Sequence, residues 1–181
     1  MKKYLVLTLF LILSLIYSYH EINMKEIKAL KEGYVKIHFN QDNQVEYSVT
    51  SKRPRNWVRL GQIPKEVYMA IVISEDWAFF EHKGVDVEQL QIAVLEALQG
   101  KKLRGASTIT QQIAKNLFTN ADRSIFRKVK ELIIAKLLER ELPKRKILEI
   151  YLNIIEYGRN LYGISDASHF YFDKNVSDLD V

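Results

Sequence analysis

The 181-residue chain contains no cysteine and little glycine or proline, with seven and three residues respectively. The absence of cysteine excludes disulfide scaffolds, thiolate metal sites, iron–sulfur clusters and cysteine nucleophiles. The low glycine and proline content, beside 48% hydrophobic and 27% charged residues, excludes collagen-like, low-complexity and wholly disordered chains. The sequence is therefore that of a globular protein of about one domain.

The whole chain has a net charge of +5, and acidic residues are scarce in one long stretch of it. Residues 101–146 hold thirteen Lys and Arg against four Asp and Glu. Such a stretch is commonly a solvated helix face, and it also suits a phosphate-bearing ligand or anionic lipid headgroups. No nucleic-acid-binding motif is present, so we expect no nucleic-acid partner. A shorter basic connector, residues 51–62, contains Trp57.

Long hydrophobic runs are absent except at the N-terminus. Two lysines precede an apolar or weakly polar run over residues 4–19, which as a helix would extend ~24 Å, slightly less than the ~30 Å hydrocarbon core of a bilayer. We expect residues 1–20 to form a single uncleaved membrane anchor; a cleaved signal peptide and a buried core helix are the alternatives. The lysines favour a cytoplasmic N-terminus, which would place the rest of the chain outside the cytoplasm.

The rest of the chain is expected to be mostly α-helical. Residues 34–39 and 45–49 alternate around a turn-like segment and predict a small β-hairpin near the membrane. Hydrophobic periodicity and capping signals predict helices over residues 21–32, 64–84, 86–99, from 108 onward, 124–142, 143–157 and 162–172. The expected organisation is an anchor (1–20), a juxtamembrane helix, hairpin and basic connector (21–62), and a helical domain (63–181).

Glu75 is the candidate general base. It extends the apolar face of the helix over residues 64–84 one turn after Ile71, where desolvation would suit a carboxylate to accept a proton. An isolated Glu-Asp pair at a helix end is more often surface charge. His82 is expected to be a structural hydrogen-bonding residue beside Phe79, because the four histidines show no metal-ligand spacing.

Three further groups of polar residues have helical spacing. Ser107, Gln111 and Lys115 are expected to form one stripe that presents a hydroxyl, an amide and an ammonium group to a sugar and a phosphate. Thr108 and Gln111 have the spacing of a capping box. Glu131 lies four residues after Arg127, a spacing common to ordinary surface ion pairs on helices.

Four segments occur in the order and spacing of a known family. They are residues 75–86 (Glu-Asp-x-x-Phe-x-x-His-x-Gly-x-Asp), 105–116 (Gly-Ala-Ser-Thr-x-Thr-Gln-Gln-x-x-Lys-Asn), 127–131 (Arg-Lys-x-x-Glu) and 147–153 (Ile-Leu-x-x-Tyr-Leu-Asn). A fifth, weaker match covers residues 163–174. On these segments the chain resembles the peptidoglycan glycosyltransferases (glycosyltransferase family 51), and most resembles the monofunctional biosynthetic transglycosylases.

The resemblance implies a lysozyme-like domain that polymerises lipid II into glycan strands with release of undecaprenyl diphosphate, on the outer side of the bacterial cytoplasmic membrane. It implies that Glu75 is the base and that Glu131 acts at the donor site. It gives substrate contacts to six residues: Ser107, Gln111, Lys115, Arg123, Arg127 and Lys130. No cofactor is required, although the resemblance allows a divalent cation (Mg²⁺ or Mn²⁺) at the donor diphosphate. The expected partners are lipid II, the lipid-linked glycan strand, membrane lipid and cell-wall synthesis proteins.

Two other functions are left open by the sequence. A lytic enzyme of lysozyme-like architecture would cleave glycan with a carboxylic acid as general acid. Its substrate would be a neutral glycan, which does not need the positive charge of residues 101–146 for binding. The family domain continues with a further helix, whereas this chain stops at Val181, so it reads as C-terminally short. An inactive truncated relative that only binds lipid-linked precursor or wall-synthesis proteins is therefore the main alternative.

Overall fold

The computed structural model describes residues 22–100, 105, 107–119 and 125–180. The anchor expected over residues 1–20 lies outside these ranges. Within them, no helix has both the length and the apolar character needed to cross a membrane.

A short helix and a β-hairpin open the described chain. Helix α2 (Met24–Ala29) is capped by Asn23, whose side chain accepts from two backbone amides of the first turn, and it is shorter than the helix expected over 21–32. Strands β1 (Tyr34–Phe39) and β2 (Val45–Thr50) pair antiparallel, with Tyr34 opposite Thr50. The hairpin predicted from alternation is confirmed.

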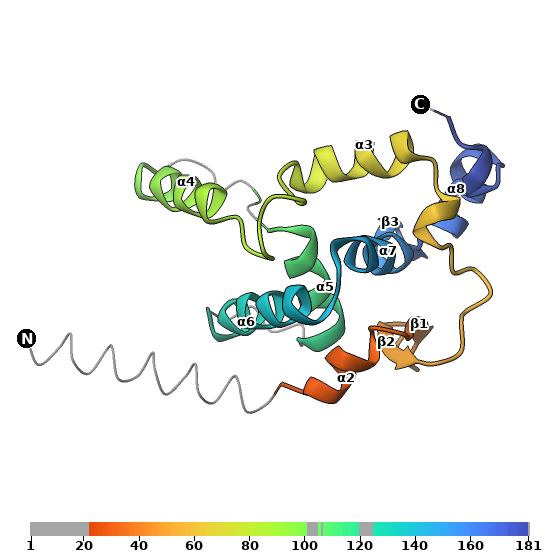
Figure 1. Cartoon of the computed structure of the whole chain (residues 1–181), viewed down its shortest axis with the longest axis horizontal. Coiled ribbons are helices and arrows are strands. Elements are labelled where there is room, and N and C mark those ends of the chain that lie inside the picture. Colours follow the sequence, from red (N-terminus) through yellow and green to blue (C-terminus); the bar gives the residue numbers. More distant parts are fainter. Residues whose placement is uncertain (1–21, 101–104, 106, 120–124, 181) are drawn as a thin grey trace, which may run out of the picture.

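The rest of the chain is predominantly helical (Figure 1). After a 3₁₀ turn, η1 (Leu60–Gln62), the helices are α3 (Lys65–Asp76), α4 (Val87–Leu98), α5 (Ile109–Phe118), α6 (Ile125–Glu141), α7 (Lys144–Ile154) and α8 (Ile164–Phe172). A small hairpin of β3 (Glu156–Gly158) and β4 (Leu161–Tyr162) separates α7 from α8, and the 3₁₀ turn η2 (Val176–Asp178) follows α8. The mostly helical fold with a small hairpin agrees with the sequence prediction.

Helices α5, α6 and α7 pack together and form the centre of the core. Their fully buried side chains are mainly branched aliphatics: Ile109, Ile113, Ile134, Leu138, Ile147, Leu148, Ile150 and Leu152. Removing one such side chain to alanine costs about 2–5 kcal/mol, because the cavity left behind is only partly refilled. The basic and polar residues discussed below are therefore carried on a rigid base.

Two of the longer helices, α3 and α7, also end earlier than the sequence predicts. Helix α3 stops at Asp76 rather than near Gly84, and residues 77–83 form tight turns instead. The side chain of Asp76 leaves the helix to accept from the backbone N–H of Ile109, which fixes that end. Helix α7 stops at Ile154 rather than at 157, because Ile155 is extended and Tyr157 belongs to β3.

Helix α7 also holds the connector that leads into α3. The carboxylate of Glu149 accepts from the indole Nε1 of Trp57 at 3.0 Å and from the backbone N–H of Leu60 at 2.9 Å. The amide of Asn153 accepts from the N–H of Val58 and donates to its carbonyl, both at 2.8 Å. Glu149 and Asn153, two polar residues of the segment 147–153, thus bind the connector and thereby help to position α3.

Candidate active site

A cleft of about 240 Å³ opens between the end of α3, the start of α4 and the segment before α5. Its lining residues are Ile73, Ser74, Glu75, Asp76, Trp77, Asp86, Gln89, Gly105, Ser107 and Thr108. Glu75 and Ser107, two of the residues predicted from the sequence, therefore share one cavity.

Glu75 is exposed in this cleft, and the expectation that the apolar face of α3 buries it is wrong. The buried positions of α3 are Val72 and Asp76, four residues apart. Glu75 precedes Asp76 by one residue, which turns its side chain about 100° away from that buried line. Its carboxylate is accessible to a ligand and accepts a hydrogen bond at 3.0 Å from Nε2 of Gln112.

Two phenols lie near the carboxylate of Glu75. Burial raises the pKa of the Tyr151 phenol well above its usual range, and the negative charge of Glu75 raises it further. Burial and the same charge likewise raise the pKa of Tyr157. The Tyr151 hydroxyl donates to Oε1 of Gln112 at 3.4 Å. Tyr151 thus stays neutral and orients the amide that binds Glu75.

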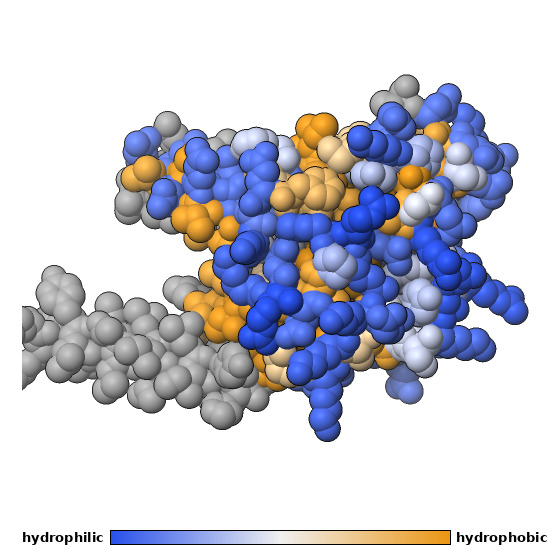
Figure 2. Space-filling model, viewed as in Figure 1, coloured by the Kyte–Doolittle hydropathy of each residue, from blue (hydrophilic) through white to orange (hydrophobic). Residues whose placement is uncertain are grey.

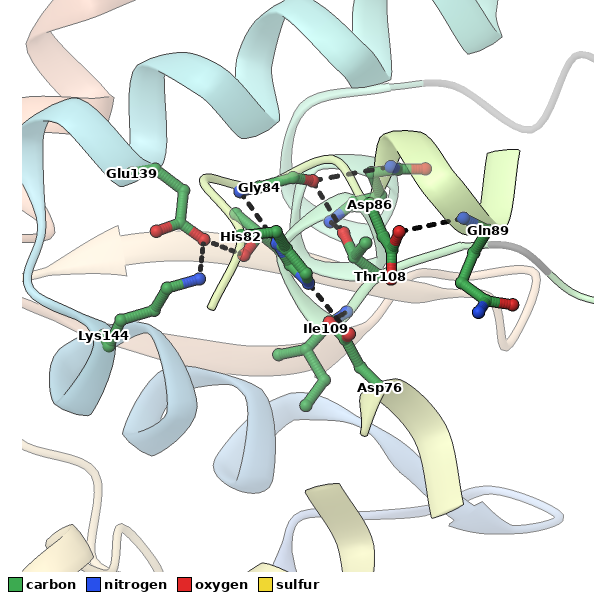
Figure 3. Close-up of polar contacts among 11 residues, drawn as sticks. Asp76, His82, Gly84, Asp86, Gln89, Thr108, Ile109, Glu139 and Lys144 are labelled. Atoms are coloured by element: carbon green, nitrogen blue, oxygen red, sulfur yellow. Dashed lines mark hydrogen bonds and ion pairs between the residues drawn. The ribbon is translucent and has the colours of Figure 1, made fainter. Parts of the chain in front are cut away.

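Asp76 and His82 belong to a buried polar network at the wall of the cleft (Figure 3). Asp76 Oδ1 lies 2.8 Å from His82 Nε2, and Asp76 Oδ2 accepts from the N–H of Ile109 at 2.9 Å. His82 Nδ1 accepts from the N–H of Gly84 at 3.1 Å, and the Gly84 carbonyl accepts from Thr108 Oγ1 at 2.7 Å. His82 is a structural hydrogen-bonding residue, as predicted, and the network joins the ends of α3 and α5.

A buried carboxylate supports the other side of α5. Glu139 Oε1 accepts from Thr110 Oγ1 at 2.6 Å and from Lys144 Nζ at 2.8 Å (Figure 3). The Lys144 ammonium lies 4.2 Å from the ring centroid of Phe79, a cation–π distance. The first turn of α5 is therefore fixed by two carboxylates from other helices, Asp76 of α3 and Glu139 of α6.

Lys128 contacts several of the predicted site residues, although the sequence did not identify it as one of them. Its Nζ donates to Ser107 Oγ at 3.0 Å and to Gln111 Oε1 at 2.9 Å, and it lies 3.3 Å from Glu131 Oε2. Glu131, only 3% exposed, also binds Arg127. The spacing of three residues between Lys128 and Glu131, which places both on one helix face, is the signal that could have found it.

The remaining predicted substrate-binding residues are distributed differently from the expected stripe. Gln111 is buried, and its Nε2 donates to the Gly84 carbonyl at 3.4 Å, so it is not an exposed group in line with its neighbours. Lys115 is exposed on α5. Lys130 lines a separate recess of about 220 Å³ beside α2. Arg123 lies outside the described residues.

Thr108 caps α5 as predicted, because its Oγ1 accepts from the N–H of Gln111 at 3.2 Å. The Gln111 side chain binds Gly84 and Lys128 rather than completing a capping box. Among the described residues, no three His, Asp or Glu side chains converge where they could hold a metal ion. Glu131 has both carboxylate oxygens bound by cations, so its surroundings do not fit a metal held by the protein alone.

A family model described as "Transglycosylase" matches residues 42–181. Over 182 residues the chain is 43% identical to penicillin-binding protein 1F of Bacillus subtilis, covering 98% of this chain and 25% of that protein. It is 41% identical over 130 residues to a biosynthetic peptidoglycan transglycosylase of Nitrosomonas eutropha, covering 71% and 53%. The corresponding protein of Shewanella amazonensis is 44% identical over 123 residues, covering 68% and 50%. The chain thus spans between a quarter and about half of the length of these relatives.

Proposed function

The chain belongs to the transglycosylase family, and we propose that it is a peptidoglycan glycosyltransferase that polymerises lipid II. The observation that carries the proposal is the position of Glu75, whose carboxylate is exposed in the cleft and held by Gln112. At the edge of the same cleft, Lys128 donates a hydrogen bond to Ser107, which is one of the lining residues. Transfer from a diphosphate donor requires a base and a cation close to one another.

In the proposed reaction the 4-hydroxyl oxygen of the acceptor sugar attacks the anomeric carbon of the lipid-linked donor. A carbon–oxygen bond forms there, and the bond from the same carbon to the diphosphate oxygen breaks, with inversion. The proton of the hydroxyl passes to the carboxylate of Glu75. The bonding electrons leave with the lipid diphosphate. Gln112 fixes the carboxylate during this transfer, because a positioned base is more effective than a freely rotating one.

The leaving group carries the charge that develops in this step, and Lys128 is proposed to stabilise it. Lys128 already binds Ser107, Gln111 and Glu131, so its ammonium group is held in place before substrate arrives. Preorganised cations are usually the largest electrostatic contribution to such a transfer. In this scheme Glu131 orients Lys128 and Arg127 rather than contacting sugar. A divalent cation at the donor would be held mainly by the diphosphate oxygens, and no step here depends on it.

A lipid-linked substrate also needs an apolar route to the cleft. Ile73 and Trp77 line the cleft and are 63% and 60% exposed. Phe80 and Val87 add exposed apolar surface nearby in the chain, and hydrophobic residues come to the surface over α3 and α4 (Figure 2). Trp57, by contrast, is buried in the core. We propose that this side of the molecule faces lipid, with residues 1–20 as a single-pass anchor and the domain outside the cytoplasm.

The test is lipid II polymerisation by the detergent-solubilised chain beside Glu75→Gln, which removes the base and nearly preserves its shape. Glu66→Gln is the matched control, because Glu66 is also an exposed glutamate of α3. Polymer from the parent and from Glu66→Gln, with none from Glu75→Gln, is the expected result. Polymer from all three would remove Glu75 as the base. A folded parent that binds lipid II and makes no polymer would favour a binding-only relative.

A further inference from the structure

A larger hollow, of about 490 Å³, lies between the β1–β2 hairpin and the connector that follows it. Lys36, Thr50, Arg53, Trp57 and Asn153 are among its lining residues, and none of its lining residues belongs to the cleft at Glu75. Its volume falls in the range of sites for small molecules. The hollow is therefore separate from that cleft, and the proposed transfer reaction assigns it no role.

The side chains that line this hollow carry charge of one sign. Four of them are cationic and none is acidic, the four being Lys36, Lys52, Arg53 and Arg55. The cause is visible in the sequence, because residues 47–65 contain five Lys and Arg and no Asp or Glu. All four cations are exposed to solvent.

These four cations also lack acidic partners. Across the described residues none of them forms an ion pair, whereas Lys128, Lys144 and Lys146 each lie within 4.0 Å of a carboxylate oxygen. Unpaired cations that surround one hollow add their potentials inside it. An anion that enters would gain attraction without having to displace an existing acidic partner.

The frame that carries the cations is fixed at several points. Lys52 N–H donates to Thr50 Oγ1 at 3.1 Å on one side. On the other side Asn56 Nδ2 donates to Asp166 Oδ2 at 3.0 Å, and the indole of Trp57 donates to Glu149. The connector is thus held in place on both sides of the two arginines, so the hollow exists before any ligand binds.

We propose that this hollow is a second, non-catalytic site that binds the phosphate groups of an anionic ligand. Guanidinium groups, here those of Arg53 and Arg55, can bind two oxygens of one phosphate, and the lysines supply further positive charge. A phosphate ester carries up to two negative charges, so four cations favour it over a single carboxylate. The shared chemistry is the phosphate group, whether from a lipid headgroup or from a soluble ester.

The reporter for the test is Trp57, which lines the hollow. The chain has two tryptophans, so Trp77→Phe leaves Trp57 as the only one. Lys128→Gln is added to remove diphosphate binding at the proposed donor site. The full chain in a nonionic detergent is titrated with inorganic pyrophosphate. In a second arm, phosphatidylglycerol is added to the micelles, with phosphatidylcholine as the neutral reference.

The deciding variant is Lys52→Gln/Arg53→Gln/Arg55→Gln. Its matched control is Lys25→Gln/Lys28→Gln/Lys31→Gln, which removes the same charge from exposed lysines on and just after α2. We expect the first triple variant to bind pyrophosphate or phosphatidylglycerol about tenfold more weakly or worse, since each exposed cation contributes modestly. The control should bind as the parent does, and thermal unfolding should be the same for all three.

The two arms identify the source, because a response to phosphatidylglycerol alone indicates a lipid headgroup and a response to pyrophosphate indicates a soluble ester. Equal weakening in both triple variants would overturn the proposal in favour of unspecific charge attraction. No saturable change in either arm would overturn it as well. A poly-glutamate peptide that binds as tightly as pyrophosphate would replace it with an acidic protein partner. None of these outcomes depends on glycosyl transfer.

Discussion

The side-chain amide of Gln112 donates to Oε2 of Glu75 at 3.0 Å and joins helix α5 of the core to the open cleft. The two residues are 37 positions apart in the sequence. Gln112 in turn accepts from Tyr151, which is buried in the centre of the core. The Gln112 amide therefore connects the exposed carboxylate to the rigid core.

Replacing Gln112 by leucine tests this connection. Loss of one hydrogen bond to a charged group is worth about 1.5–3 kcal/mol, so we expect kcat of lipid II polymerisation to fall about 10–100-fold. KM should change little, because the amide contacts the base in this scheme and not the substrate. Gln99→Leu, at an exposed position after α4, is the control and should leave both constants unchanged. A rise in KM alone would assign Gln112 to substrate binding.

Asp76 is expected to matter for stability rather than for chemistry. Asp76→Ala leaves the N–H of Ile109 unpaired and deprives His82 of its partner. We expect the free energy of unfolding to fall by about 2–4 kcal/mol, the cost of two buried polar groups left without partners. Urea unfolding measures it. Glu81→Ala, an exposed acidic residue nearby, should stay within about 0.5 kcal/mol of the parent; equal effects would argue against the network.

Gly84 and Gly61 offer a matched pair of glycine substitutions. Gly84 has φ +82°, and a Cβ there would lie 2.8 Å from the carbonyl oxygen of Ala135. We expect Gly84→Ala to destabilise the fold by about 2–4 kcal/mol through backbone strain and overpacking. A Cβ on Gly61 would meet no atom within 4 Å, so Gly61→Ala should be neutral or slightly stabilising. Thermal unfolding of both variants compares them, and similar melting temperatures would contradict the expectation.

Alkaline pH should weaken the fold through the buried phenols. Burial raises the pKa of Tyr151 above its ordinary value of 10.0. Above pH 10 the unfolded chain therefore loses this proton while the folded chain keeps it, and stability falls as pH rises. One such group contributes a slope of up to about 1.4 kcal/mol per pH unit. Unfolding free energies from pH 8 to 11 should fall less steeply for Tyr151→Phe than for the parent, and identical slopes would exclude the effect.

Local signals in the sequence predicted part of this structure correctly. Thr108 predicts the start of α5, because its hydroxyl caps backbone only three residues away. The alternation of apolar and polar residues predicts the β1–β2 hairpin, because its two strands are also close together in the sequence. The end of α3 could not be read in this way, because it depends on Asp76 binding Ile109, 33 residues later in the chain. Features that depend on residues close in sequence could be predicted, whereas features that depend on contacts between distant residues could not.

The candidate site shows the same division. Glu75 and Ser107 were named from the sequence, and the fold places both in one cleft. The exposure of Glu75 was predicted wrongly, because the buried line of α3 runs through Val72 and Asp76 and not through the half-buried Ile71. An error of one residue in helix phase turns a side chain by about 100°. Lys128 was missed because its contacts run from α6 to Ser107 and Gln111, which lie 21 and 17 residues earlier in the chain.

The hydrogen bonds between α7 and the connector have a consequence for the order of folding. Trp57 and Glu149 are 92 residues apart, and Val58 and Asn153 are 95 apart. Closing loops of this length costs conformational entropy before the contacts that they permit can stabilise the chain. Such long-range contacts therefore slow folding. A ribosome-bound chain cannot form them until α7 has been made. We expect α5–α7 to assemble first, and the connector, with the hollow beside it, to acquire its final shape in a late kinetic phase.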